Sequence, residues 1–315
     1  ESLIEYKLQD KRSSARKDNV QMKPNGISRR QALASIATIS AGALIKPSSI
    51  FCSPVKDKIR LALIGDWGTG DHDEAGTARQ MFTSHQRSPF DFVISAGDNV
   101  YPNGSGRYFG KHFEQPFADI LKDRVNFYAV LGNHDVDAGR EDQCQYPLFN
   151  MGGRNYYKIE KGNGLADFFM LDSTDFDRGQ ENWLEDSLRA SRAKWKIAVF
   201  HHPIYSSARY HGSSLALRKR LEPLLNRYGV RVAFSGHDHV YERTKPQQAV
   251  QYFVSGAGGK CRRGDVDQGS SFRAASFDQD NHFMVIEIDD KQVSFQAISE
   301  TGVVVDNGLV TQAQF

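Results

Sequence analysis

The chain has 315 residues, of which 39% are hydrophobic and 25% are charged, a balance typical of a globular protein with a large core. Its formal net charge of +2 is too close to zero for a dedicated nucleic-acid or membrane-surface binder. None of its 3 cysteines belongs to a CxxC pair, which argues against a thiolate zinc site.

The first predicted element is an N-terminal targeting segment. A basic stretch ends in the pair Arg29-Arg30, and a small-residue apolar run with an A-x-A pattern follows at 32–44. This order is typical of a twin-arginine export signal, and the run is too short to span a bilayer. We therefore expect an export signal and linker at 1–55, a folded domain at 56–315, and an extracytoplasmic mature protein without stable membrane insertion. A surface amphipathic helix and an organelle transit peptide are the alternatives.

Short apolar runs then alternate with amphipathic stretches. Strands buried on both faces are expected at 59–64, 90–96, 125–131, 195–200 and 230–234. Helices are expected at 74–86, 108–121, 181–191 and 215–228. This alternation predicts a largely parallel α/β arrangement. Short strands with tight turns follow at 251–254, 283–288, 293–298 and 303–305, so the C-terminal part is expected to be antiparallel.

Polar side chains follow all five of the first strands. In chain order they lie in Gly65-Asp66, Gly97-Asp98, Gly132-Asn133-His134-Asp135, His201-His202 and Gly236-His237-Asp238-His239. Active sites of α/β sheets collect at the carboxyl ends of strands. Five successive strands that end in Asp, Asn or His therefore predict one shared site.

The side chains at these strand ends have the chemistry of metal ligands. Carboxylate, carboxamide and imidazole groups suit Fe, Zn or Mn, and Tyr101, three residues after Asp98, would add a phenolate oxygen. The candidate ligands are Asp66, Asp98, Tyr101, Asn133, His201, His237 and His239. Seven ligands are too many for one ion with an open position, but they suit two ions that share a carboxylate. Such sites clamp the attacking and leaving oxygens of a phosphoryl displacement.

These strand-end segments carry a family resemblance. The segments are Asp66-Trp67-Gly68, Gly97-Asp98-Asn99-Val100-Tyr101, Gly132-Asn133-His134-Asp135, Ala198-Val199-Phe200-His201 and Gly236-His237-Asp238-His239. They resemble the five motif blocks of the purple acid phosphatases, in particular the small, mammalian-type branch of these calcineurin-like metallophosphoesterases. The resemblance implies a metallophosphoesterase domain, a four-layer α/β/β/α sandwich in which two mixed sheets face each other.

The resemblance also implies which ions are bound. Gly68 stands where most metallophosphoesterases have a histidine ligand, and Tyr101 replaces that ligand. In the family this tyrosinate binds Fe(III). The implied Fe(III) ligands are Asp66, Asp98, Tyr101 and His239. The implied ligands of a divalent Fe, Zn or Mn are Asp98, Asn133, His201 and His237.

His134 and His211 resemble family positions that contact the substrate, which implies a catalytic role for both. The implied enzyme is an acid phosphatase that hydrolyses phosphate monoesters by attack of a metal-bound hydroxide, with either histidine protonating the leaving oxygen. We expect Asp135 and Asp238 to orient neighbouring histidines and Asp172 to stabilise a turn.

The sequence leaves two other functions open. One is a phosphodiesterase or nucleotide pyrophosphatase on the same scaffold, and the other is a non-catalytic phosphate-binding protein. The expected partner is a phosphate monoester and not a nucleic acid. The sequence does not decide the natural substrate, the divalent metal or the oligomeric state. It also leaves open whether Cys144 and Cys261 form a disulfide bond.

Overall fold

The computed structural model describes residues 58–314 of the chain. The export signal expected at 1–55 lies outside this range and stays a prediction. Within the described range, none of the helices has the length and apolar character needed to cross a membrane. Cys144 and Cys261 are free thiols, so no disulfide bond joins them.

One mixed sheet of 6 strands has the order β13-β12-β11-β1-β2-β3. Its strands are β1 (Ile59–Ile64), β2 (Phe92–Ser95), β3 (Asn126–Ala129), β11 (His282–Ile288), β12 (Gln292–Ser299) and β13 (Val304–Thr311). The strands β1, β2 and β3 are parallel. β11 pairs antiparallel with β1, and β12 and β13 continue the antiparallel part.

The second mixed sheet has 7 strands in the order β10-β8-β9-β7-β6-β5-β4. Its strands are β4 (Tyr157–Lys161), β5 (Ala166–Met170), β6 (Trp195–Val199), β7 (Val232–Ser235), β8 (Tyr241–Thr244), β9 (Gln251–Ser255) and β10 (Arg273–Phe277). The strands β5, β6, β7 and β9 run parallel to one another. Antiparallel pairs β4–β5, β8–β9 and β8–β10 complete the sheet.

Aromatic side chains join the two sheets face to face. Phe92 of β2 meets Phe168 of β5 at a ring-centroid distance of 5.6 Å, and Phe253 of β9 meets Phe295 of β12 at 4.8 Å. Because side chains alternate across a strand, the other faces of the sheets are left for helices to cover.

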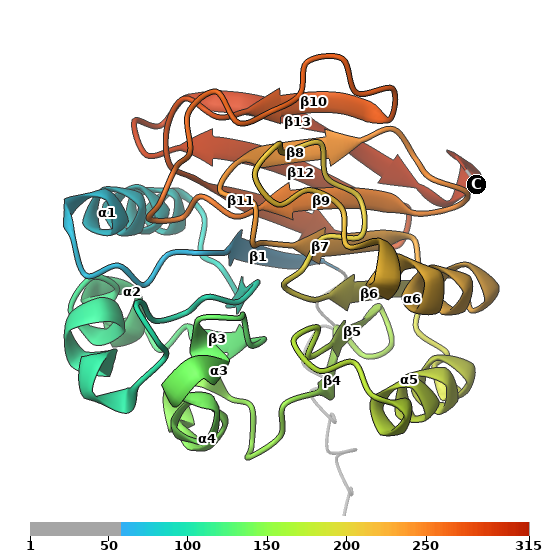
Figure 1. Ribbon diagram of the computed structural model, residues 1–315, viewed down its shortest axis with the longest axis horizontal. Coiled ribbons are helices and arrows are strands. Elements are labelled where there is room, and N and C mark those ends of the chain that lie inside the picture. The colour runs from blue at the N-terminus through green and yellow to red at the C-terminus, as the bar shows by residue number, and fades with distance from the viewer. Residues whose placement is uncertain (1–57, 315) are drawn as a thin grey trace, which may run out of the picture. The chain divides into compact units, whose positions relative to one another are not determined.

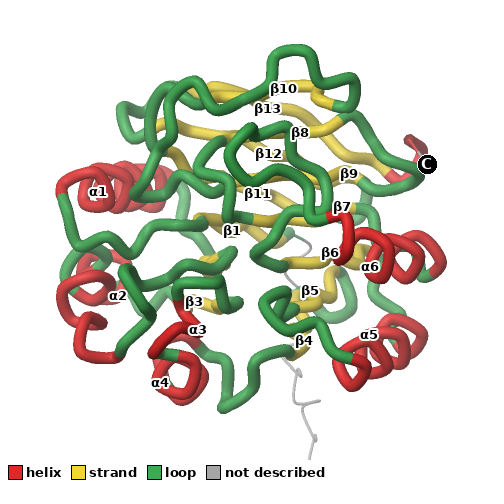
Figure 2. Tube along the Cα trace, in the orientation of Figure 1, coloured by secondary structure: helices red, strands yellow, loops and turns green. Residues whose placement is uncertain are grey.

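Helices cover the outer faces of the two sheets (Figure 1). Beside the first sheet lie α1 (His72–Arg87), α2 (Ala118–Lys122), α3 (Asp135–Ala138) and α4 (Arg140–Gln145), and beside the second lie α5 (Arg178–Ala190) and α6 (Leu215–Arg227). Figure 2 shows the strands between these two groups of helices. This arrangement confirms the predicted α/β/β/α sandwich.

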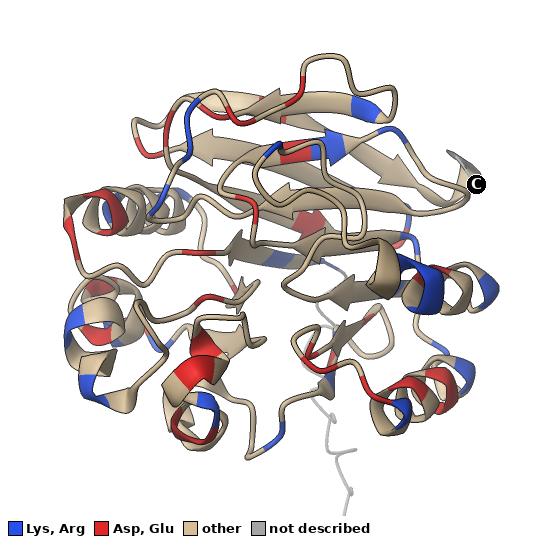
Figure 3. Cartoon of the chain, viewed as in Figure 1, with Lys and Arg blue, Asp and Glu red and all other residues tan. Residues whose placement is uncertain are grey.

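Local sequence explains where the main helices lie. The Asp71 carboxylate accepts hydrogen bonds from the first backbone N–H groups of α1, as a helix N-cap does. In α5, Leu184 and Leu188 lie one turn apart and are fully buried against the second sheet. Acidic and basic side chains are interspersed on the outer helices (Figure 3), and some pair, as Glu185 and Arg189 do at 3.1 Å.

The structure corrects two predicted elements. Instead of one helix at 108–121, the chain forms a 3-10 turn (Gly106–Tyr108), a π-helical turn (Gly110–Glu114) and then α2. Pro116, which has no backbone N–H, lies just before α2 and breaks the helical hydrogen-bond pattern. The strand expected at 251–254 is β9, which runs parallel to β7 as well as antiparallel to β8. Further 3-10 turns lie at Pro147–Phe149 and Gln312–Gln314.

Candidate metal centre

The candidate ligands lie in the loops that directly follow five parallel strands. The loop after β1 carries Asp66, that after β2 carries Asp98 and Tyr101, that after β3 carries Asn133, that after β6 carries His201, and that after β7 carries His237 and His239. Three of these strands belong to one sheet and two to the other. The site therefore forms where parallel strands of both facing sheets end.

The first group of side chains gathers around the Tyr101 hydroxyl. This hydroxyl donates to Asp98 Oδ2 at 2.9 Å and is 3.3 Å from Asp66 Oδ1. It also lies 3.3 Å from His239 Nε2. All four residues are buried. The structure thus brings together the four residues that the family resemblance assigns to Fe(III).

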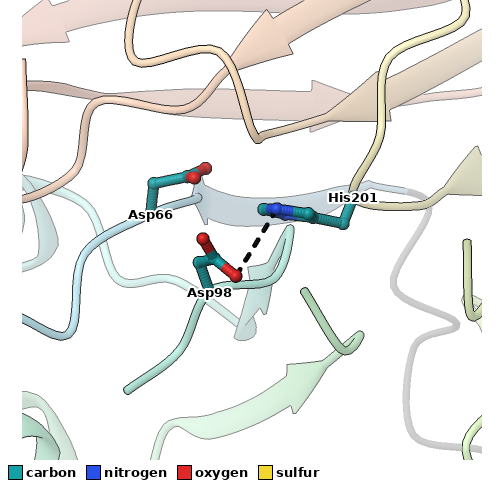
Figure 4. A group of neighbouring side chains, drawn as sticks. All are labelled: Asp66, Asp98 and His201. Carbon is teal, nitrogen blue, oxygen red and sulfur yellow. Dashed lines mark ion pairs between the residues drawn. The ribbon is translucent and has the colours of Figure 1, made fainter. Parts of the chain in front are cut away.

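The second group gathers around His201 Nε2. This atom is 3.1 Å from Asn133 Oδ1 and 3.3 Å from His237 Nδ1. It is also 3.5 Å from Asp98 Oδ1 (Figure 4). Asp98 therefore turns one carboxylate oxygen toward each group. One ligand atom each from Asp66, Asp98 and His201 lie within 4.8 Å of one another.

Backbone groups orient these side chains toward the centre. His201 Nδ1 lies 2.9 Å from the Ala96 carbonyl oxygen and donates to it, so the lone pair of Nε2 points at the cluster. The backbone N–H of His134 donates to Asp98 Oδ1 at 2.9 Å, and that of His237 donates to Asp66 Oδ2 at 2.8 Å. The ligand geometry is thus held by the protein itself.

The electrostatics of the cluster fit bound cations. Burial, together with the nearby Asp98 carboxylate, raises the pKa of Asp66, and burial also raises the pKa of Asp98. Burial lowers the pKa of His201 and takes the pKa of His239 down to about 3. The imidazoles are therefore neutral and offer lone pairs, while two close buried carboxylates need positive charge to be ionised together.

Three of the candidate ligands have a left-handed backbone conformation. Asp66 has φ 56°, Asp98 has φ 51° and His237 has φ 71°. Few residues other than glycine adopt this conformation, and the strain is typically found at functional sites. It turns the chain sharply at the end of the strand. The sequence carried no signal of it, because none of the three positions is a glycine.

Two glycines leave room for ligands that belong to other loops. A Cβ atom on Gly132, after β3, would lie 2.1 Å from Asp98 Oδ1, after β2. A Cβ atom on Gly236, after β7, would lie 2.4 Å from Asp66 Oδ2, after β1. Both distances are far below normal contact, so these positions require glycine.

The expected role of Asp135 is wrong. Its carboxylate orients no histidine: it accepts backbone N–H groups of Asn99 at 2.9 Å, Val100 at 3.1 Å and Gly132 at 2.8 Å. Gln143 Nε2 also donates to it, at 2.6 Å. Asp135 thus joins the loop after β2 to the loop after β3. Sequence reasoning missed Gln143 and Asn99 as members of this buried network, since neither residue type nor spacing marks them.

Of the other two aspartates, Asp172 has the expected role and Asp238 does not. Asp172 pairs with Arg140 and accepts the backbone N–H of Thr174 at 2.9 Å, so it stabilises a turn as predicted. The expectation that Asp238 orients a histidine ring is wrong: its Oδ1 accepts the backbone N–H of Gly212 at 3.3 Å, and it therefore acts on the loop next to His211.

The two candidate catalytic histidines lie against different groups of the cluster. The His134 ring packs on Tyr101, with centroids 4.6 Å apart, and its Nδ1 donates to the Pro102 carbonyl at 2.7 Å. Its Nε2 is therefore the atom available to a substrate. His211 is exposed, and its ring centroid is 4.1 Å from that of His237.

The strand-end cluster on this sandwich defines the class of protein. The family model named Calcineurin-like phosphoesterase matches residues 59–241. Purple acid phosphatase 17 of Arabidopsis thaliana is 31% identical over 252 residues, which are 69% of this chain and 74% of the relative. Tartrate-resistant acid phosphatase type 5 of Homo sapiens is 29% identical over 303 residues, 82% of this chain and 92% of the relative.

The chain therefore belongs to the calcineurin-like phosphoesterase family and, within it, to the purple acid phosphatases. It is accordingly an acid phosphatase, a hydrolase of this family. Among solved structures, GAP50, the anchor in the inner membrane complex of Plasmodium, has a TM-score of 0.72 at 22% identity, covering 81% of this chain and 89% of that one. That likeness shows the fold alone, and a shared fold does not decide activity.

Proposed function

We propose that this acid phosphatase hydrolyses phosphate monoesters at the strand-end cluster. The observation that carries the proposal is the position of Asp98, whose two oxygens face the Tyr101 group at 2.9 Å and the His201 group at 3.5 Å. A carboxylate between two sets of neutral and anionic ligands is suited to bridging two cations.

The donor set suits two different ions. Asp66, Tyr101 and His239, with Asp98, would hold Fe(III), which favours phenolate and carboxylate oxygens. Asn133, His201 and His237, with Asp98, would hold a divalent Fe, Zn or Mn ion. When bound, such ions lower the pKa of water and neutralise charge on phosphoryl oxygens.

The remaining steps fall to side chains that flank the cluster. His134 Nε2, fixed by the bond from Nδ1 to the Pro102 carbonyl, would donate a proton to the leaving oxygen or contact the phosphoryl group. His211, beside His237, would do the same from the other side. The buried aspartate network around Asp135 keeps the loops after β2 and β3 in one arrangement, which limits reorganisation during the reaction.

Metal analysis and a substrate comparison test this proposal. The purified protein is expected to contain two metal ions per chain and to hydrolyse p-nitrophenyl phosphate much faster than its bis ester. Asp98→Ala should abolish turnover and reduce metal content in both positions. Preference for the bis ester would identify a phosphodiesterase instead, and a metal-loaded protein inactive on both would indicate a phosphate-binding protein.

We also propose that the mature protein is extracytoplasmic. The support is the Arg29-Arg30 pair with the apolar run after it. A route that carries folded proteins suits an enzyme that acquires its metals before export.

A further inference from the structure

The loop at 206–213 determines where His211 lies. It leaves β6 after His201 and brings the His211 ring against His237. The tip of this loop lies at the surface, where Tyr210 is 64% exposed and its ring centroid lies 3.4 Å from the Arg262 guanidinium carbon. Ala208 is the member of the loop that joins an apolar cluster, with Val240 and Val266. Backbone bonds hold the loop as well: the Arg209 N–H donates to the Asp265 carbonyl at 2.8 Å, and the Asp267 N–H donates to the Ser207 carbonyl at 2.9 Å.

Three buried carboxylates also bond to the backbone of this loop. Glu242 Oε2, in β8, accepts the Ser207 N–H at 2.7 Å. Asp265 Oδ1 accepts the Tyr210 N–H at 3.0 Å, and Asp238 Oδ1 accepts the Gly212 N–H at 3.3 Å. The bonds are spread along the loop at intervals of two or three residues, and two of them flank His211 in sequence.

These carboxylates are buried, which is costly for charged groups without strong hydrogen bonds. Glu242 and Asp238 have no exposed surface, and Asp265 is 7% exposed. Of the three bonds, the one to Glu242 is the shortest, at 2.7 Å, and short bonds from backbone N–H groups to a carboxylate are stronger than neutral ones. Glu242 lies three residues beyond His239, and its carboxylate bonds to the Ser207 N–H of the loop, so its influence on the site passes through the loop.

We propose that Glu242 is a positioning residue for His211: through Ser207 it holds the loop at 206–213 so that the imidazole stays beside His237 and reaches the substrate. Asp265 supports the same loop at its tip. The inference rests on the substrate-contacting role proposed for His211. It assigns to Glu242 no contact with substrate or metal.

A matched pair of Glu242 variants separates the effect of side-chain length from that of the carboxyl group. Glu242→Asp keeps the carboxyl group but withdraws the oxygen from the Ser207 N–H, whereas Glu242→Gln keeps the length and an acceptor oxygen. We expect the aspartate variant to lose about tenfold to 10²-fold in kcat, as a displaced catalytic group does, and the glutamine variant to stay within about threefold of the parent. Both should retain two metal ions per chain.

The decisive measurement combines each variant with His211→Ala. If Glu242 acts through His211, Glu242→Asp should change kcat by less than about twofold in the His211→Ala background, because the two losses are not additive. Equal losses in both backgrounds, loss of metal, or equal damage by Asp and Gln would overturn the inference. Normal turnover of His211→Ala alone would instead refute the role proposed for His211, while metal-dependent hydrolysis would stand.

If the Glu242 variants fail to fold, a variant of a second residue that holds the loop tests the proposal. Asp265→Ala removes the acceptor of the Tyr210 N–H at a position closer to the surface. It should lower kcat in the same way and lose its effect in the His211→Ala background. An undiminished effect in that background would again overturn the proposal.

Discussion

Replacing Gly132 with alanine should disrupt the metal centre, although Gly132 itself binds no metal. The new Cβ would lie 2.1 Å from Asp98 Oδ1 and 2.3 Å from the Asp98 backbone N, whereas ordinary contact begins at 3.4 Å. The carboxylate must therefore move by about 1 Å, and the nearby backbone prevents a simple swing of the side chain. Metal–ligand distances vary by only about 0.2 Å, so Asp98 cannot clear the methyl group and still hold two ions.

We expect Gly132→Ala to lose metal and to lower kcat/KM by at least about 10²-fold. Overpacking of this kind should cost about 1–3 kcal/mol of stability, which is small enough for the protein to fold. Metal content, turnover of p-nitrophenyl phosphate and thermal unfolding measure the three effects. Gly110→Ala is the matched control, because its Cβ would meet no atom within 4 Å. Two ions per chain and near-normal turnover in Gly132→Ala would refute the reasoning.

The remaining predictions concern the acid, the colour and the export signal. His134→Ala should keep its metals and lose about 10²–10⁴-fold in kcat, with a smaller loss for nitrophenyl than for alkyl phosphates. Equal losses for the two substrates would argue against proton donation. Oxidised protein should show a visible charge-transfer band that Tyr101→Phe removes, and an iron-free, colourless and fully active enzyme would contradict the Fe(III) assignment. A reporter fused to residues 1–55 should be exported through the twin-arginine route, and changing Arg29 and Arg30 to lysine should retain it in the cytoplasm. Unchanged export of that variant would point to another signal.

The general fold and the gathering of the candidate ligands were predictable because two simple patterns coincide. Continuous apolar runs identify strands that are buried on both faces, and polar residues right after them lie at one edge of the sheets. Asp66, Asp98 and His201 follow this pattern, and the structure brings their ligand atoms within 4.8 Å. The motif order then selected the family, which the comparisons confirm.

What could not be predicted depends on contacts between distant segments. Asp135 binds the backbone of Asn99, 36 residues earlier, and no local pattern indicates that pairing. The helix expected at 108–121 has suitable periodicity, but Pro116 divides it. The strand β8, only 4 residues long and partly polar, gave too short a pattern to be recognised. Glu242 lies within it, so its contact with the loop at 206–213 was also beyond sequence reasoning.

Metal binding and folding of this protein are thermodynamically linked, and the left-handed conformation of three candidate ligands adds a cost to the metal-free native state. Each such residue carries a cost on the order of 1–3 kcal/mol, and the buried carboxylates of Asp66 and Asp98 add repulsion. Ions that bind only the native state stabilise it by about 2.7 kcal/mol at a concentration 100 times the dissociation constant, which offsets this cost. Substitutions that relieve the left-handed strain, such as His237→Gly, should therefore stabilise the metal-free native state while abolishing activity. Because the ions bind the native state and not the unfolded chain, this enzyme should unfold at a higher temperature when loaded with metal than when empty.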